Sequence, residues 1–172
     1  MDKLKQILTA KEIDERVSDI ANQISHDFEN STPILLGVLK GSYIFLADLT
    51  RKMKIESEVE FVRLKSYNGN TSTNNVKILY DFNKSLEERD IIIIEDIIDT
   101  GNTLKFLYKK IQELNPRSIS IASFLVKPES NKFRFKIDYI GFEIPSDFVV
   151  GYGLDFNEKY RNLDSLFCLI NK

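Results

Sequence analysis

The feature that most constrains the fold is a run of four isoleucines that leads directly into acidic residues. Ile91–Ile94 is followed by Glu95, Asp96, two further isoleucines and Asp99. A short, continuous apolar run is typical of a strand buried on both faces, and such strands occur mainly in parallel sheets. Carboxylates that follow a buried strand are costly to leave without partners. The segment therefore predicts a buried strand that ends at a polar site.

The remaining segments alternate between helix and strand patterns. Helices are predicted from about Thr9 to Phe28, where Thr9 and Glu12 fit a capping box, over Tyr43–Met53, and from Thr103 to Leu114. Strands that alternate with helices indicate an α/β fold with a largely parallel sheet, whose ligands bind at the carboxyl ends of the strands. Besides the isoleucine strand, the predicted strands are Ile34–Leu39, Val59–Leu64, Val76–Tyr80, Ile119–Val126, Ile137–Gly141, Phe148–Val150 and Leu166–Ile170, the last of which is expected to close the sheet.

Two connecting stretches are polar. Ser66–Asn75 is rich in Gly, Asn and Ser and is predicted to be a mobile loop. Lys84–Asp90 is predicted to be a charged connector that needs no function beyond solvation.

The charge balance argues against a broad surface for nucleic acid or anionic lipid. The 172 residues carry 24 Lys+Arg and 26 Asp+Glu, a formal net charge of −2, so neither polyanion meets a basic field. No stretch approaches the ~18 apolar residues of a membrane span. The expectation is a single-domain, cytoplasmic protein without nucleic-acid or membrane partners. A small charged ligand needs only a few local groups and is not excluded.

Thr100–Thr103 has the composition of a phosphate-binding nest at the start of a helix. Gly101 permits a close backbone approach, and the Thr and Asn side chains add donors. The carboxylates just upstream would repel a phosphate unless they face ribose hydroxyls, a divalent cation or a proton on a base. The combination therefore suits a sugar phosphate better than a bare phosphate.

The segment Glu95–Thr103 resembles the phosphoribosyl-diphosphate signature of the type I phosphoribosyltransferases. Other segments resemble the hypoxanthine-guanine members of that family: Leu39–Ser42 their pyrophosphate loop, Lys127 their purine-reading lysine, and Gly141–Pro145 and Phe148–Arg161 their purine-binding hood. The resemblance spans roughly Pro33 to the C-terminus. It implies the type I phosphoribosyltransferase fold, in which helices flank a central, mostly parallel sheet. Residues 1–172 would form one domain, with a small hood over the purine site from about 127–172 and the N-terminus.

The resemblance also implies a role for each residue of the signature. Glu95 and Asp96 would bind the ribose hydroxyls, directly or through Mg²⁺, and Asp99 would be the catalytic group that accepts a proton near N7 of the purine. The loop after them would hold the 5′-phosphate. The whole phosphoribosyl-binding set is Glu95, Asp96, Ile98, Asp99, Thr100, Gly101, Asn102 and Thr103.

The pyrophosphate side is implied in the same way. Lys40, Gly41 and Arg161 would bind pyrophosphate, and the family adopts a cis peptide bond at the position of Leu39 and Lys40. Asp155 would bind a second Mg²⁺, so the implied metal ligands are Glu95, Asp96 and Asp155. Considered without the family, Asp155 and Arg161 are equally consistent with an ordinary surface ion pair.

The purine would be bound by Lys127, Phe148, Val149 and Asp155. By the resemblance, Lys127 donates to an oxo group at C6, Phe148 stacks on the base and Val149 contributes backbone groups. Without the family, a lone lysine at a strand end is usually exposed, and an aromatic residue at this spacing is more often part of the core. Ser66 and Tyr67 fit the Ser-Tyr pair of the family's closing loop.

The reaction expected from the resemblance is purine salvage. Phosphoribosyl would pass from 5-phosphoribosyl 1-diphosphate to hypoxanthine or guanine in the presence of Mg²⁺, giving IMP or GMP and pyrophosphate, in a homodimer or homotetramer. Two alternatives remain: a phosphoribosyltransferase that prefers xanthine, and a regulator of the same fold that binds nucleic acid. The near-neutral charge disfavours the regulator.

Overall fold

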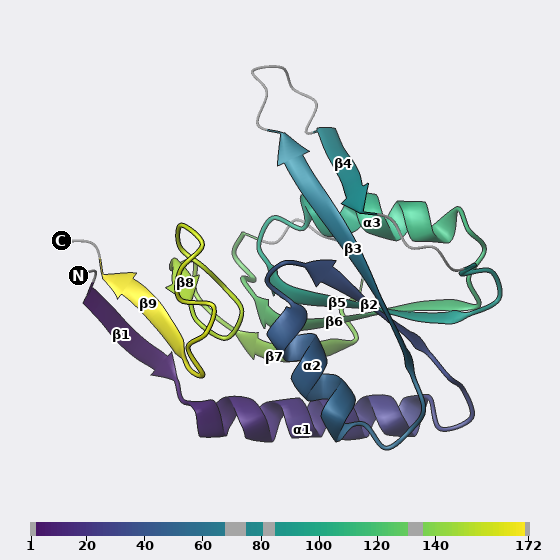
Figure 1. The fold of residues 1–172 in the computed structure, drawn as a ribbon, viewed down its shortest axis with the longest axis horizontal. Helices are drawn as coiled ribbons and strands as arrows, with labels where there is room; N and C mark the ends of the chain where they lie inside the picture. Colours follow the sequence, from purple (N-terminus) through teal and green to yellow (C-terminus); the bar gives the residue numbers. More distant parts are fainter. Residues whose placement is uncertain (1–2, 68–74, 81–84, 131–135, 171–172) are drawn as a thin grey trace.

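The computed structural model describes residues 3–67, 75–80, 85–130 and 136–170. Its centre is a six-stranded sheet in the order β4-β3-β2-β5-β6-β7 (Figure 1). The edge strand β4 runs antiparallel to β3, and the other pairings are parallel, which confirms the predicted α/β class. The bounds are β2 Ile34–Leu39, β3 Glu58–Tyr67, β4 Asn75–Tyr80, β5 Asp90–Ile98, β6 Ser118–Val126 and β7 Tyr139–Glu143.

The isoleucines of β5 supply two cores, one on each face of the sheet. Ile92 and Ile94 pack in the cluster that contains the buried residues of α1 (Ala10–Asp27) and α2 (Tyr43–Lys52). Ile91 and Ile93 pack with α3 (Asn102–Gln112) in the other cluster. Successive side chains of a strand point to opposite faces, so a continuous apolar run is required between two helical layers. Figure 1 shows α1 and α2 on one side of the sheet and α3 on the other.

The helix α1 begins as its sequence predicts. The Thr9 hydroxyl accepts a hydrogen bond from the Glu12 N–H (3.2 Å), and the Glu12 carboxylate accepts one from the Thr9 N–H (2.8 Å), so the capping box is confirmed. Its buried apolar face comprises Ile13, Val17, Ile20, Ala21 and Ile24. Across the described ranges, no helix combines the length and the apolar character that crossing a membrane requires.

A second, smaller sheet joins the two ends of the chain, which is the arrangement expected of the hood. Its order is β1-β9-β8, with β1 Lys3–Leu8, β9 Leu166–Ile170 and β8 Val149–Val150 (Figure 1). The prediction that Leu166–Ile170 closes the main sheet is therefore wrong. The strand β1 was not predicted, because most of its side chains are exposed or half-buried and carry no clear alternation. Its pairing depends on a partner more than 150 residues away, Leu4 facing Leu169 for example.

The edge hairpin is longer than predicted. Ser66 pairs with Val76 and Tyr67 with Asn75, so the ends of the expected loop Ser66–Asn75 belong to β3 and β4. The antiparallel ladder continues beyond the apolar residues because backbone groups, which every residue type carries, hold it. Residues 68–74 lie outside the described part of the chain. The closing role of Ser66 and Tyr67 stays a prediction.

Candidate active site

The candidate site lies at the point where the strand order of the six-stranded sheet reverses. After β2 the chain passes through α2 to β3 on one side, and after β5 it passes through α3 to β6 on the other. Ligands of open α/β sheets bind outside the carboxyl ends of the strands at such a point. The residues found there are Lys40 and Gly41 after β2 and Asp99 after β5. The peptide bond between Leu39 and Lys40 is cis, as the resemblance implied.

The loop after β2 lies directly against the acidic end of β5. A Cβ atom built on Gly41 would overlap the carboxylate of Asp96, so only glycine leaves room for this approach. A Cβ atom on Gly153, whose φ is +97°, would overlap the carbonyl oxygen of Gly41. Three segments distant in sequence therefore converge at this end of the sheet.

A cavity of about 230 Å³ lies over the start of α3 and is lined by Glu95–Leu104. The helix is preceded by Gly101 at φ 73°, a left-handed conformation that glycine adopts without strain. No side chain caps the helix there, so the N–H groups of its first turn are available to an anion. Thr100, Asn102 and Thr103 all line the cavity, and their role in binding phosphate stays a prediction.

The two adjacent acids of β5 have raised pKa values. Burial, and then the charge of Asp96, raise the pKa of Glu95 well above its ordinary value. Burial raises the pKa of Asp96 to about 6, even though the Ile97 N–H donates to its carboxylate (2.9 Å) and Arg161 is nearby. For both acids, the cost of burying the charged form thus exceeds what the neighbouring protein groups offset. Such a pair favours a ligand that donates hydrogen bonds or carries positive charge.

A second cavity, of about 260 Å³, adjoins the first. It is lined by Asp96, Ile97, Asp99, Lys127, Phe148, Val149, Leu154 and Asp155. All four predicted purine-binding residues therefore face one pocket. Asp96, Ile97 and Asp99 line both cavities. Ile97 and Leu154 were not singled out from the sequence, since nothing distinguishes them from core residues.

The structure excludes the simpler interpretation of Lys127 and of Phe148. Lys127 is 8% exposed, and its Nζ lies 3.6 Å from Asp99 Oδ2, so it is not a solvent-exposed lysine. Phe148 is 53% exposed and meets Phe156 edge to face with ring centroids 5.7 Å apart, so it is not part of the core. A buried cation and an exposed ring on one pocket are suited to a flat, polar aromatic ligand.

The predicted pyrophosphate residues form an ionic cluster. Arg161 Nη2 lies 2.6 Å from Asp155 Oδ1, and Arg161 Nη1 donates to the Gly153 carbonyl (2.8 Å). Lys40 Nζ lies 2.9 Å from Glu158 Oε1. Glu158 was not predicted, because its contact with Lys40 spans 118 positions and no local spacing marks it. Within the described residues, the Arg161 Nε atom is buried without a hydrogen-bond partner and remains available to an acceptor.

Comparison with known proteins agrees with this geometry. The sequence model of the phosphoribosyl transferase domain matches residues 3–157. The chain belongs to the phosphoribosyltransferase family. It is 41% identical to a hypoxanthine phosphoribosyltransferase of Buchnera aphidicola over 93% of this chain and 92% of the relative. It is 43% identical to a hypoxanthine-guanine phosphoribosyltransferase of Dictyostelium discoideum over 93% of this chain and 92% of that one.

A solved structure extends the likeness to the whole fold. The hypoxanthine-guanine phosphoribosyltransferase of Bacillus anthracis superimposes with a TM-score of 0.93 at 37% sequence identity, covering 99% of this chain and 100% of that chain. The type I phosphoribosyltransferase fold is therefore confirmed.

The three implied magnesium ligands of this phosphoribosyltransferase are all carboxylates. Among the described residues, no three Asp, Glu, His or Cys side chains are grouped so as to hold a metal ion. Mg²⁺ commonly takes only one or two carboxylates and completes its shell with water and substrate phosphates. The desolvated carboxylates of Glu95 and Asp96 have the right ligand chemistry for that mode. The assignment of Glu95, Asp96 and Asp155 as magnesium ligands stays a prediction.

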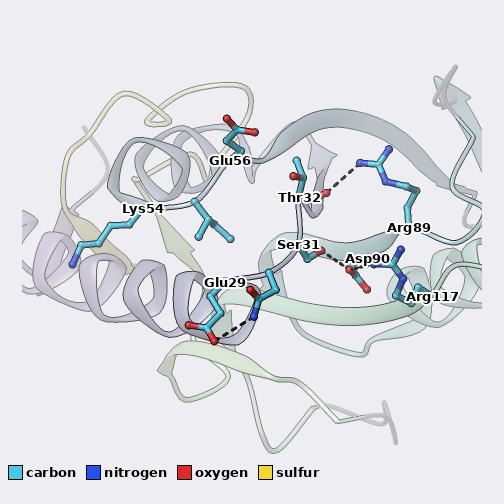
Figure 2. Close-up of a pocket in the computed structure, with 10 residues that line it drawn as sticks. Glu29, Ser31, Thr32, Lys54, Glu56, Arg89, Asp90 and Arg117 are labelled. Carbon is cyan, nitrogen blue, oxygen red and sulfur yellow. Dashed lines mark hydrogen bonds and ion pairs between the residues drawn. The ribbon is translucent and has the colours of Figure 1, made fainter.

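A larger pocket, of about 670 Å³, lies at the amino ends of the strands (Figure 2). Several of its polar groups are bonded within the protein. Asp90 accepts hydrogen bonds from Ser31, Ser118 (2.7 Å) and Arg117 (3.0 Å). Arg89 donates to the Thr32 carbonyl (3.1 Å). The prediction that Lys84–Asp90 is only a solvated connector is wrong at two residues. Leu86 is 1% exposed and packs in the cluster of Ile91 and Ile93, and Asp90 begins β5 and is 7% exposed.

Proposed function

We propose that this phosphoribosyltransferase transfers phosphoribosyl from 5-phosphoribosyl 1-diphosphate to N9 of hypoxanthine or guanine, giving IMP or GMP and pyrophosphate. The observation that carries the proposal is the pair of adjoining cavities that share Asp96, Ile97 and Asp99. A nucleoside monophosphate joins phosphate, ribose and base in the same order as the helix start, the shared acids and the aromatic pocket. The names of the relatives support the choice of purine.

The phosphoribosyl group would occupy the first cavity and its shared wall. The N–H groups at the start of α3, with Thr100 and Thr103, would hold the 5′-phosphate through hydrogen bonds and the helix dipole. The ribose hydroxyls would donate to Glu95 and Asp96. These bonds offset the burial that raises the pKa of both acids.

The base would occupy the second cavity, where Lys127 sets its identity. An ammonium group only donates hydrogen bonds, so a buried Lys127 would donate to an oxo group at C6. It would have no acceptor to offer the amino group that adenine carries there, which disfavours adenine. Phe148 stacks on the base, Val149 contributes backbone groups to its edge, and Asp155 completes the pocket wall. Asp99, on the wall shared by both cavities, accepts a proton near N7 as the glycosidic bond forms.

The leaving pyrophosphate would be bound by Lys40, by Arg161 and by the backbone of Gly41. The transition state is expected to carry positive charge on the ribose and negative charge on the departing group, which these cations stabilise. When bound by Glu95, Asp96 or Asp155, Mg²⁺ would supply further positive charge beside the phosphate oxygens. Ser66 and Tyr67 would help to exclude water from the activated sugar.

We further propose that residues 1–172 act as one phosphoribosyltransferase domain, in a cytoplasmic homodimer or homotetramer. The charge of −2 supports a protein whose partners are small molecules.

The test is steady-state product formation with hypoxanthine, guanine, xanthine and adenine, with Mg²⁺ and with a chelator. We expect turnover of hypoxanthine and guanine only with Mg²⁺, and only weak turnover of adenine. The fastest turnover with xanthine would favour the xanthine enzyme instead. Salt-dependent binding of RNA or DNA without product formation would favour the regulator.

A further inference from the structure

Glu158 occupies the space between the two cations assigned to pyrophosphate. Lys40 Nζ lies 2.9 and 3.0 Å from the two oxygens of its carboxylate, and Arg161 Nη2 lies 3.3 Å from Oε2. Lys40 follows β2, whereas Glu158 and Arg161 belong to the loop after β8. The tertiary structure thus brings an anionic group of the protein to the place that an anionic part of the substrate would take.

The backbone at Glu158 does not account for a glutamate there. Phe156 and Lys159 form an antiparallel bridge with reciprocal hydrogen bonds, and Asn157 and Glu158 are the two residues of its turn. Their φ angles are 53° and 62°, the left-handed pair typical of a type I′ turn, whose positions favour Gly, Asn or Asp. Turn chemistry would favour glycine at the second position, so the side chain's contacts with two cations are what distinguish glutamate.

The contact of Glu158 with Lys40 and Arg161 is exposed enough for another anion to displace it. The Glu158 side chain is 66% exposed, and that of Lys40 is 45% exposed. Exposed ion pairs are weak, and a side chain at the tip of a two-residue turn can rotate into solvent without moving a strand. A pyrophosphate group that approaches Lys40 and Arg161 meets a like charge at Glu158. Both anions cannot occupy the same donors.

We propose that Glu158 is an internal competitor for the pyrophosphate site, bound to Lys40 and Arg161 in the free protein and displaced by the pyrophosphate group of the substrate. The inference rests on the proposed function, because it takes Lys40 and Arg161 as the pyrophosphate ligands. The same competition acts on the product side. When pyrophosphate leaves, Glu158 returns to the two cations, which weakens retention of the product.

The direct test is calorimetric binding of inorganic pyrophosphate, with Mg²⁺, to the full chain and to Glu158→Gln. The amide keeps the size of the side chain and removes its charge. We expect the Kd of pyrophosphate to fall by about two- to tenfold, since two weak ion contacts no longer compete. The KM for 5-phosphoribosyl 1-diphosphate should fall with it, while kcat stays level or decreases through slower product release. The difference should shrink as salt is raised.

The matched control is Glu113→Gln. Glu113 is similarly exposed (62%) and pairs with Lys110 (2.6 Å) at the far end of α3, so removal of its charge should leave the Kd of pyrophosphate unchanged. An unchanged or weaker affinity in Glu158→Gln, with wild-type binding intact, overturns the proposal and leaves the proposed function standing. A wild-type protein that binds no pyrophosphate overturns both.

Discussion

Both ends of the central sheet carry pockets lined with charged residues, but the two ends differ in how fully other protein groups bind those residues. At the amino ends, Asp90 is bound by two hydroxyls and a guanidinium, and Arg89 by a carbonyl and by the carboxylate of Glu58 (2.7 Å), as Figure 2 shows in part. At the carboxyl ends, burial raises the pKa of Glu95 and Asp96, and the Arg161 Nε atom lacks a partner among the described residues.

This difference shows that the volume of a pocket does not by itself identify the candidate active site. The amino-end pocket is larger, about 670 Å³ against about 230 and 260 Å³. Its Arg89, Asp90 and Arg117 side chains are already bonded within the protein and gain little from a ligand. The polar groups at the carboxyl end are held in place while their hydrogen-bonding capacity remains open. Substitutions at the two ends should therefore divide between activity and stability.

The largest expected effect is on activity at the carboxyl end. Asp99→Asn removes the proposed proton acceptor, and kcat with hypoxanthine is expected to fall by about 10²–10⁴-fold. The melting temperature should stay close to wild type, because the Asp99 side chain is 50% exposed. Asp19→Asn, an exposed aspartate of α1, is the control and should leave kcat unchanged. Full activity of Asp99→Asn would falsify the assignment.

The next effect is on stability at the amino end. Asp90→Ala leaves two hydroxyls and Arg117 without their shared acceptor, and the free energy of unfolding should fall by about 2–3 kcal/mol. Denaturant unfolding measures this, and kcat should be unchanged. A loss of activity without a loss of stability would reverse the division between the two ends.

The free energy of unfolding should also depend on pH through Asp90. Burial raises its pKa, but hydrogen bonds from Ser31 and Ser118 and the charge of Arg117 outweigh burial, so the pKa lies below the ordinary 3.8. A carboxyl group whose pKa is lower in the folded than in the unfolded protein stabilises the fold at pH values above its unfolded pKa. That contribution is lost as the pH falls through its folded pKa. The stability difference between wild type and Asp90→Ala should be full above about pH 4 and shrink below it.

A specificity effect follows at the purine pocket. Lys127→Ala is expected to lower kcat/KM for hypoxanthine and guanine by about 10- to 100-fold, because the proposed buried donor to the oxo group is lost. The weak activity with adenine should not fall in parallel, which initial rates with each base would reveal. Lys109→Ala, an exposed lysine on α3, serves as the control. An equal loss for all bases would mean that Lys127 does not read the C6 position.

The smallest effect is expected for Arg117→Ala. Its side chain is 63% exposed, so the ion pair with Asp90 is largely screened and the free energy of unfolding should change by about 0.5 kcal/mol or less. Asp90 would still be bound by Ser31 and Ser118. A loss as large as that of Asp90→Ala would show that the charge, rather than the hydroxyls, stabilises this end.

Local patterns predicted much of the fold. The capping box at Thr9, the strand Ile34–Leu39 and the isoleucine run of β5 lie where the sequence placed them. Each depends on contacts within one element or on burial that the apolar run itself requires. The acids Glu95, Asp96 and Asp99 and the glycine Gly101 were singled out from their order along the chain, because they lie at the end of β5 and in the short turn that joins it to α3.

Other features depended on partners far away in sequence. The separate sheet formed by β1, β9 and β8, the buried position of Asp90 and the contact of Lys40 with Glu158 were not predicted. Edge pairing uses backbone groups that every residue carries, and an ion pair across 118 positions leaves no periodic trace. The sequence by itself determined the α/β class and the order of the acids and the glycine after the isoleucine run. Only the tertiary structure decided which charges satisfy one another and which remain open to a ligand, because that depends on the distances between segments that the chain separates.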